Sequence, residues 1–78
     1  MEYSEIIRER ILTLCREQKL SINRLASLSG LPQSTIDNIV QRSTKYPSIA
    51  TIHRIANAFG MTPAEFLNTT EINEFEFE

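Results

Sequence analysis

Apolar residues recur at helical spacing through most of the chain, and polar residues occupy the intervening positions. The first such segment predicts a helix over residues 4–17, because its apolar positions follow the 4-3-1 spacing of one helix face. Acidic residues lie near the start of this segment and basic residues near its end, which suits the helix dipole. The positions expected to face the core are Ile7, Ile11, Leu14 and Cys15.

The next stretch divides into a short helix and a turn. Ser21 is a favourable N-cap residue, and it predicts a helix over residues 21–28 that directs Leu25 and Ala26 inward, with Leu28 as a third candidate. Gly30 ends this helix, because the left-handed conformation that often follows a helix costs glycine least. Pro32 can start another helix, since a first-turn residue needs no partner for its N–H. The two helices are therefore expected to be joined by a tight turn.

The third helix is predicted over residues 33–41, and its two faces differ in chemistry. One face is apolar and carries Ile36, Ile39 and Val40. The other face contains three amide side chains, which favour helices less than the Glu, Lys and Ala usual on exposed faces. This face is either simply solvated or is used for binding. It consists of Gln33, Ser34, Asp37, Asn38 and Gln41.

The rest of the body is predicted to be a loop and two further helices. Residues 42–47 form a polar loop, after which Ser48 caps a fourth helix that runs to about Phe59. Thr62 and Glu65 form a capping box around a proline at the first helical position, which predicts a short fifth helix. The expected inward residues are Ile49, Ile52, Ile55, Ala56 and Phe59 on the fourth helix, and Phe66 and Leu67 on the fifth.

The last residues follow a different pattern. Phe75 and Phe77 alternate with glutamates, which is the period of an extended strand and not of a helix. Three interpretations stay open: a frayed acidic end, a strand that pairs with its copy in a dimer and buries Ile72 with both phenylalanines, or a segment that binds another protein. We expect the aromatic side chains to dock, either on the fifth helix around Phe66 or on a two-fold mate.

The composition of the 78-residue chain narrows the class of protein. Hydrophobic residues make up 41% and charged residues 23%, which is ordinary for a globular domain. The single cysteine, Cys15, excludes an intrachain disulfide, and one Cys with one His cannot build a structural zinc site. No apolar run approaches the roughly 18 residues of a membrane span, and the polar, acidic N-terminus does not resemble a signal peptide. We therefore expect a cytoplasmic protein with no metal, cofactor or membrane partner.

The net charge of −2 hides an uneven distribution. Four of the ten acidic residues fall in the last eight positions, which contain no Lys or Arg. The first 70 residues therefore carry eight basic and six acidic side chains, a net charge of +2. Surface charges act on a partner only locally, because physiological salt screens them within about 8 Å. The body is thus compatible with a nucleic-acid partner despite the acidic tail.

A short helix, a tight turn and a second short helix with a polar face together form a helix-turn-helix pattern. Its features are Leu25-Ala26, Ser29-Gly30-Leu31, Ser34-Thr35-Ile36, Ile39, Lys45-Tyr46-Pro47, Thr51-Ile52, Ile55-Ala56, Phe59-Gly60 and Glu65-Phe66-Leu67. In this order and spacing, from about Ile7 to Asn68, the sequence resembles the phage repressor and Cro type of helix-turn-helix, a large family of xenobiotic-response-element-like bacterial regulators.

The resemblance implies an all-α, five-helix repressor-like bundle over residues 1–70, followed by a short acidic tail over residues 71–78 for dimerisation or a protein partner. It also implies sequence-specific binding of double-stranded DNA in the cytoplasm, at the nucleoid. Members usually act as homodimers on an inverted repeat, so the implied role is that of a transcriptional regulator and, in particular, a repressor.

The resemblance assigns roles to particular residues as well. Its recognition helix maps onto residues 33–41, where Gln and Asn can bond bidentately to adenine, Ser serves either base type and Asp can accept from cytosine. Loop and helix-start positions hold the phosphates through hydroxyl, N–H and charged groups. The implied base-reading residues are Gln33, Ser34, Thr35, Asp37 and Asn38, and the implied backbone contacts are Ser21, Gln41, Arg42, Ser43, Thr44, Lys45, Tyr46 and Ser48.

Several positions depart from the pattern of the family. Ile22 stands where members often carry a glutamine that bonds phosphate, and Ser48 stands where some send an arginine into the minor groove. Cys15 and Val40 match a pair that is often a buried arginine and glutamate. Replacing a buried ion pair by apolar groups is often neutral or stabilising, so the fold does not depend on that pair. The chain carries few basic residues overall, so we expect a modest affinity for DNA and DNA binding that relies strongly on dimerisation.

Three other functions compete with that of a DNA-binding regulator. An antitoxin or phage-encoded interaction protein would hold another protein with its tail and use DNA binding for autoregulation. A helical bundle without DNA contact would leave the polar face simply solvated. An enzyme is the least favoured, because His53 has no catalytic partner at a suggestive spacing and Cys15 is expected to be a buried core thiol. We therefore assign no catalytic, cofactor-binding or metal-binding residue.

Overall fold

The fold is that of a computed structural model, and it is described for residues 2–41 and 46–77. The regular structure in these two ranges is entirely helical, and the predicted all-α class is confirmed. The helices are α1 (Tyr3–Gln18), α2 (Ile22–Ser29), α3 (Gln33–Val40), α4 (Ile49–Ala58), α5 (Pro63–Leu67) and α6 (Thr70–Asn73).

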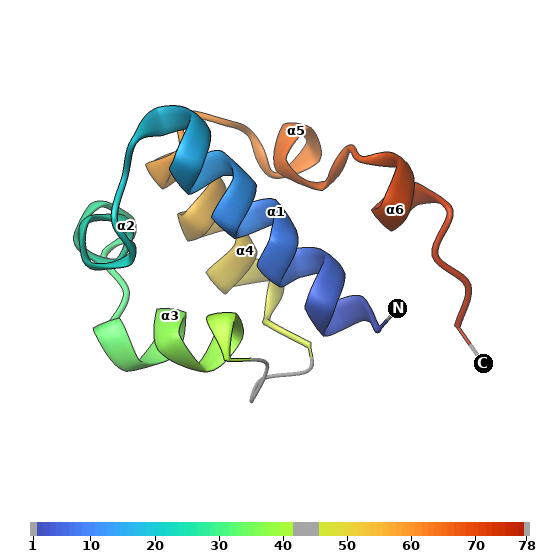
Figure 1. The fold of residues 1–78 in the computed structure, drawn as a ribbon, viewed down its shortest axis with the longest axis horizontal. Coiled ribbons are helices and arrows are strands. Elements are labelled where there is room, and N and C mark those ends of the chain that lie inside the picture. The colour runs from blue at the N-terminus through green and yellow to red at the C-terminus, as the bar shows by residue number, and fades with distance from the viewer. Residues whose placement is uncertain (1, 42–45, 78) are drawn as a thin grey trace.

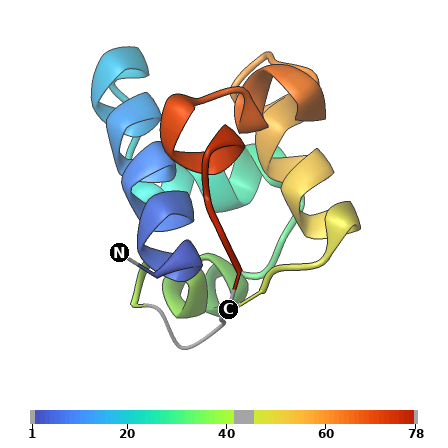
Figure 2. The same ribbon diagram turned by 90° about the vertical axis from the view of Figure 1, so that its right-hand side faces the viewer.

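Helices α1 and α4 lie at the centre of the molecule (Figure 1). Helix α2 packs against α3 and α4, and α3 also contacts α1, so α2 and α3 close one side of the bundle. Helix α5 packs against α4, and α6 contacts α1 on the opposite side. The end of the described chain returns to the start of α1 (Figure 2), where the rings of Tyr3 and Phe77 stack with centroids 5.8 Å apart.

A single cluster of apolar side chains joins α1, α2, α3, α4 and α5. The predicted apolar faces are confirmed except at two positions, the candidate Leu28 of α2, which is 45% exposed, and Ile49 of α4. Ile49 is 86% exposed, because it is the first residue of α4 and this helix is buried only from Ile52 onward. The largest of the fully buried side chains are Ile7, Ile11, Leu25, Ile36, Ile39, Ile55 and Phe66.

The starts predicted for α2, α4 and α5 are confirmed by their hydrogen bonds, whereas Pro32 precedes α3 as its N-cap and is not in its first turn. The hydroxyls of Ser21 and Ser48 each accept from the backbone N–H three residues on, at 3.0 and 3.1 Å. Thr62 and Glu65 form both bonds of the capping box, at 3.1 and 2.8 Å. The bond from the Thr62 N–H lowers the pKa of the Glu65 carboxyl, because it favours the charged form. Local side chains therefore satisfy N–H groups that the helices leave free.

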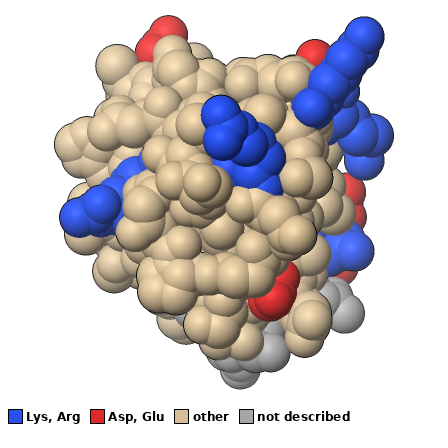
Figure 3. Space-filling view, turned by 90° about the vertical axis from the view of Figure 1, so that its left-hand side faces the viewer, with Lys and Arg blue, Asp and Glu red and all other residues tan. Residues whose placement is uncertain are grey.

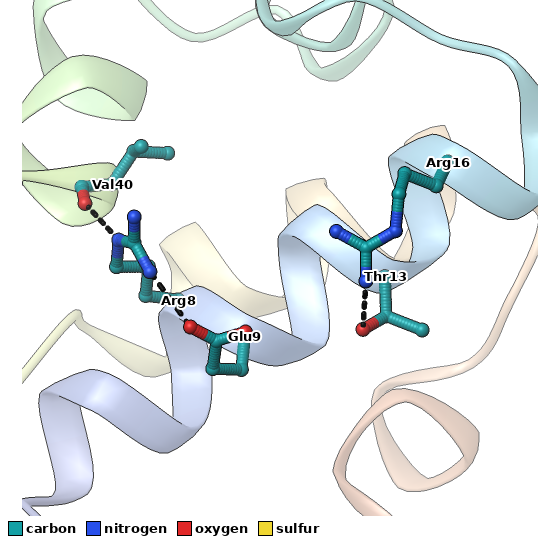
Figure 4. Close-up of polar contacts among 5 residues, drawn as sticks. All are labelled: Arg8, Glu9, Thr13, Arg16 and Val40. Atoms are coloured by element: carbon teal, nitrogen blue, oxygen red, sulfur yellow. Dashed lines mark hydrogen bonds and ion pairs between the residues drawn. The ribbon is translucent and has the colours of Figure 1, made fainter.

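Side chains of α1 bond to the carboxyl ends of three other helices. Arg8 donates from Nε to the carbonyl oxygen of Val40 at the end of α3, at 2.8 Å (Figure 4). Arg10 donates from Nε to the carbonyl oxygen of Phe66 in α5, at 2.8 Å. Gln18 donates from Nε2 to the carbonyl oxygen of Phe59, the C-cap residue of α4, at 2.9 Å. Carbonyls in the last turn of a helix have no partner within it, so these bonds satisfy groups that burial would otherwise leave unpaired. The guanidinium groups of Arg8 and Arg10 are thus engaged in hydrogen bonds within the fold.

The tail corrects the expectation of an extended segment, because it begins with a sixth helix. The hydroxyl of Thr69 caps α6 by accepting from the N–H of Ile72 at 3.2 Å, and Ile72 packs against the core. Phe75 and Phe77 follow in irregular structure and meet the ring of Tyr3, with centroids 5.1 and 5.8 Å away. The aromatic side chains therefore dock on the start of α1 and not around Phe66, because α6 turns the chain toward α1.

Candidate nucleic-acid interface

The turn between α2 and α3 is fixed by its backbone and by one neighbouring side chain. Gly30 has a φ of 71°, and the N–H of Leu31 donates to the carbonyl oxygen of Ala26 at 3.3 Å. This left-handed residue and the bond across it form the usual glycine stop of a helix. A Cβ added at Gly30 would lie 3.3 Å from Nη1 of Arg54, so the guanidinium of α4 lies directly over the turn. A side chain at position 30 would therefore have to displace Arg54 in addition to adopting a positive φ.

The polar face predicted for the third helix is exposed on α3. Gln33, Ser34 and Asn38 are exposed, and Thr35 and Asp37 are half-buried at the edge of the same face. The opposite face of α3 holds Ile36 and Ile39, whose side chains are 0% and 2% exposed. These buried isoleucines fix the rotation of α3, so its amide side chains project away from the core.

Two of the candidate residues on α3 are bonded to each other. The amide Nε2 of Gln33 donates to the carboxylate Oδ1 of Asp37 at 3.0 Å, one helical turn away. Residues four apart lie on the same side of a helix, so this bond restricts the rotamers of both side chains. Asp37 therefore orients Gln33, a role that the sequence pattern did not assign to it.

The candidate backbone contacts surround α3. Ser21 and Ser48 lie at the starts of α2 and α4, where their hydroxyls are the N-caps described above. Gln41 ends α3 and is exposed, and Tyr46 is 69% exposed just before α4. The remaining candidates, Arg42, Ser43, Thr44 and Lys45, lie outside the described residues.

The side of the molecule that carries α2 and α3 is largely uncharged, and its Lys and Arg side chains are scattered (Figure 3). Arg24, in the first turn of α2, and Arg54 on α4 are exposed, and the guanidinium of Arg54 lies close to the turn. Neither is among the backbone contacts that the resemblance implies. The sequence could not predict that Arg54 lies near the turn, because Arg54 is 24 residues beyond Gly30. The two residues come together only because α4 packs against α2.

The residues set aside as non-catalytic are consistent with structural roles. Burial raises the pKa of the Cys15 thiol, which disfavours the reactive thiolate. His53 is exposed on α4. Within the described ranges, no three His, Cys, Asp or Glu side chains gather as they would around a metal ion. None of the helices described combines the length and apolar character that a membrane crossing requires.

Comparisons with known proteins agree with this geometry. Residues 10–71 match the family model of the Cro/C1-type HTH DNA-binding domain. The chain is 33% identical over 63 residues to the HTH-type transcriptional regulator PuuR of Escherichia coli K12, and equally to PuuR of Shigella flexneri. These matches cover 81% of this chain and 34% of each relative. The chain thus spans about a third of the length of the curated relatives it matches.

A solved structure is similar over nearly the whole chain. The crystal structure of the prophage Lp1 protein 11 superposes with a TM-score of 0.84 at 33% sequence identity. The match covers 96% of this chain and 100% of that one.

Proposed function

This chain belongs to the Cro/C1-type helix-turn-helix family of DNA-binding domains, and on that premise we propose that it is a transcriptional repressor that reads duplex DNA through α3. It would act in the cytoplasm, at the nucleoid, and would bind an inverted-repeat operator as a homodimer. The observation that carries the proposal is the exposed amide-rich face of α3, which the buried Ile36 and Ile39 direct outward beside a fixed turn.

The outer face of α3 supplies the base contacts in this proposal. Gln33 and Asn38 would bond to the major-groove edge of adenine, and Ser34 would bond to either kind of base. Asp37 would orient the amide of Gln33, to which it is already bonded, or accept from a cytosine. Thr35 is half-buried, and it would contact DNA only at the edge of this surface.

The elements around α3 would hold the DNA backbone. The caps formed by Ser21 and Ser48 fix the starts of α2 and α4, and N–H groups at such starts attract phosphate. Gln41, Tyr46 and the residues 42–45 would bond phosphates on the carboxyl side of α3. Arg24 and Arg54 join this set, because Arg24 is exposed in the first turn of α2 beside the Ser21 cap and Arg54 is exposed near the turn that carries α3.

Replacing Gln33 or Asn38 by alanine should weaken specific binding by about 1–3 kcal/mol for each substitution, because each would remove a bidentate base contact. Selection from random duplex DNA would identify the operator, and fluorescence titration would then measure the affinity of each variant. Binding to unrelated duplexes should change little.

The matched control is Asn57→Ala, which removes an exposed amide from the far end of α4. It should leave operator affinity unchanged. Full operator affinity in both α3 variants would show that α3 does not read the bases.

Replacing Arg42 or Lys45 by alanine should weaken binding to every sequence alike, because phosphate contacts carry no sequence information. Each substitution should also lower the slope of log affinity against log salt by about one unit for each phosphate that the side chain had neutralised. Titrations at several salt concentrations measure this slope. Arg16→Ala is the control, because Arg16 lies at the end of α1 and bonds to Thr13 at 3.3 Å (Figure 4). Unchanged slopes for both variants would remove this loop from the DNA interface.

A further inference from the structure

The side-chain amide of Gln33 is held in one orientation by the carboxylate of Asp37. Its Nε2 donates to Oδ1 of Asp37 at 3.0 Å, and the amide bonds to no other described residue. An ionised carboxylate can only accept hydrogen bonds, so the nitrogen of the amide must face Asp37 while the oxygen faces away from it. One N–H of Gln33 is therefore occupied before any partner arrives.

The groups that remain free on Gln33 match adenine and not guanine. A glutamine amide carries two N–H groups and one carbonyl oxygen, so the bond to Asp37 leaves one donor and the oxygen. In the major groove, adenine presents the acceptor N7 and the donor N6, which these two groups can satisfy together. Guanine presents two acceptors, N7 and O6. Bonding to both would take both N–H groups of Gln33 and would break the bond to Asp37.

We propose that Asp37 determines the base specificity of α3: by occupying one N–H of Gln33, it restricts Gln33 to adenine and excludes guanine. This inference rests on the proposed function, in which Gln33 reads a base. The base that Gln33 would otherwise tolerate is the other purine, and the residue that rejects it lies one helical turn along α3. Asp37 acts through Gln33 and needs no contact of its own with DNA.

Covering this face of α3 with DNA makes the restriction effective. In water, a hydrogen bond between side chains four residues apart contributes little, because solvent can replace either partner. Once DNA covers α3, water can no longer replace Gln33 as the donor to Asp37, and a carboxylate left without a donor is strongly unfavourable. A guanine at this position would therefore either leave Asp37 unpaired or place its O6 against the oxygen of Gln33.

The charge of Asp37 supports a role in specificity and not in affinity. Asp37 is the only acidic residue between Glu17 and Glu65, and α3 contains no Lys or Arg to compensate it. A carboxylate on a face that meets DNA opposes the phosphates, so it lowers affinity for every sequence alike. Such a residue is still useful when it rejects a wrong base, because specificity is the difference between two affinities.

The substitution Asp37→Asn tests the proposal. Asn keeps the shape of Asp, but its amide can donate to the oxygen of Gln33, which releases both N–H groups of Gln33. Binding-site selection with the wild-type chain identifies the operator, and Gln33→Ala identifies the base pair that Gln33 reads. At that pair, the wild-type chain should prefer A·T over G·C by roughly 5- to 150-fold. Asp37→Asn should lower this ratio by about fivefold or more, because it binds the G·C operator more tightly.

The ratio of the two affinities separates base reading from charge and from folding. Loss of a carboxylate strengthens binding to both operators alike, so this effect cancels in the ratio. Glu17→Gln is the matched control, because it removes an exposed carboxylate near the end of α1 and should leave the ratio unchanged. A damaged fold would weaken binding to both operators, so it cannot produce tighter binding to the G·C operator.

The possible outcomes also separate this inference from the proposed function. An unchanged ratio in Asp37→Asn overturns the inference alone. The same holds for a wild-type preference for a base other than adenine at the pair that Gln33 reads, and for a Gln33→Ala variant that keeps every preference while Asn38→Ala loses one. A wild-type chain that selects no sequence overturns the proposed function, and the inference falls with it.

Discussion

Replacing Phe66 by alanine should lower the free energy of unfolding by about 3–5 kcal/mol, the largest loss expected from any single truncation in the core. Phe66 is 0% exposed, and its ring stacks on that of Phe59 with centroids 6.3 Å apart. Arg10 lies over the same ring at 5.8 Å and bonds to the carbonyl oxygen of Phe66. Truncation would therefore leave a cavity between α4 and α5 and remove the ring over which Arg10 lies.

A domain of this size is stabilised by only about 4–12 kcal/mol, so a loss of this magnitude would unfold an appreciable fraction of the molecules. Denaturant unfolding followed by circular dichroism measures the change. Phe66→Leu keeps most of the apolar volume and should cost clearly less. Equal stability of the two variants would show that the site collapses around alanine without leaving a cavity.

Replacing Cys15 by arginine should lower the free energy of unfolding by about 3–5 kcal/mol, because it places an unpaired charge in an apolar site. Cys15 is 6% exposed within the main core cluster. The same burial raises the pKa of its thiol, so the site already favours an uncharged group. Cys15→Val is the matched control, since it stays apolar and should cost much less.

The partner substitution Val40→Glu tests whether the two positions meet. If they do, the double variant should recover most of the stability lost in Cys15→Arg, and a double-mutant cycle gives the coupling energy. Arg8 adds a necessary control, because its Nε already bonds to the carbonyl oxygen of Val40 and could pair with a new carboxylate. The cycle is therefore repeated with Arg8→Met. A double variant no more stable than Cys15→Arg in both backgrounds would show that the sites do not meet.

The sequence predicted most of the helical framework correctly, because the signals that define it are local. Ser21, Ser48 and Thr62 cap the helices they were expected to cap, and Gly30 has the positive φ that ends α2. Each of these effects depends on residues no more than five positions apart. The outward face of α3 was predictable for the same reason, since the spacing of Ile36 and Ile39 determines which side is buried.

The contacts between distant segments could be decided only by the tertiary structure. Arg8 and Arg10 contribute to the positive charge of the first 70 residues, but they bond to carbonyls 32 and 56 residues away. The docking of Phe77 on Tyr3 likewise depends on α6, and Thr69 and Ile72 gave no periodic signal long enough to predict that helix.

The amino-acid sequence by itself thus determined the helices, their caps and the polar face proposed to meet DNA. Only the tertiary structure decided which arginines remain at the surface, where the aromatic tail docks and that Arg54 lies over the turn at Gly30. The physical reason is the distance along the chain over which each interaction acts. Capping and amphipathic spacing act within one or two helical turns, whereas these contacts depend on how α1, α4 and α6 pack.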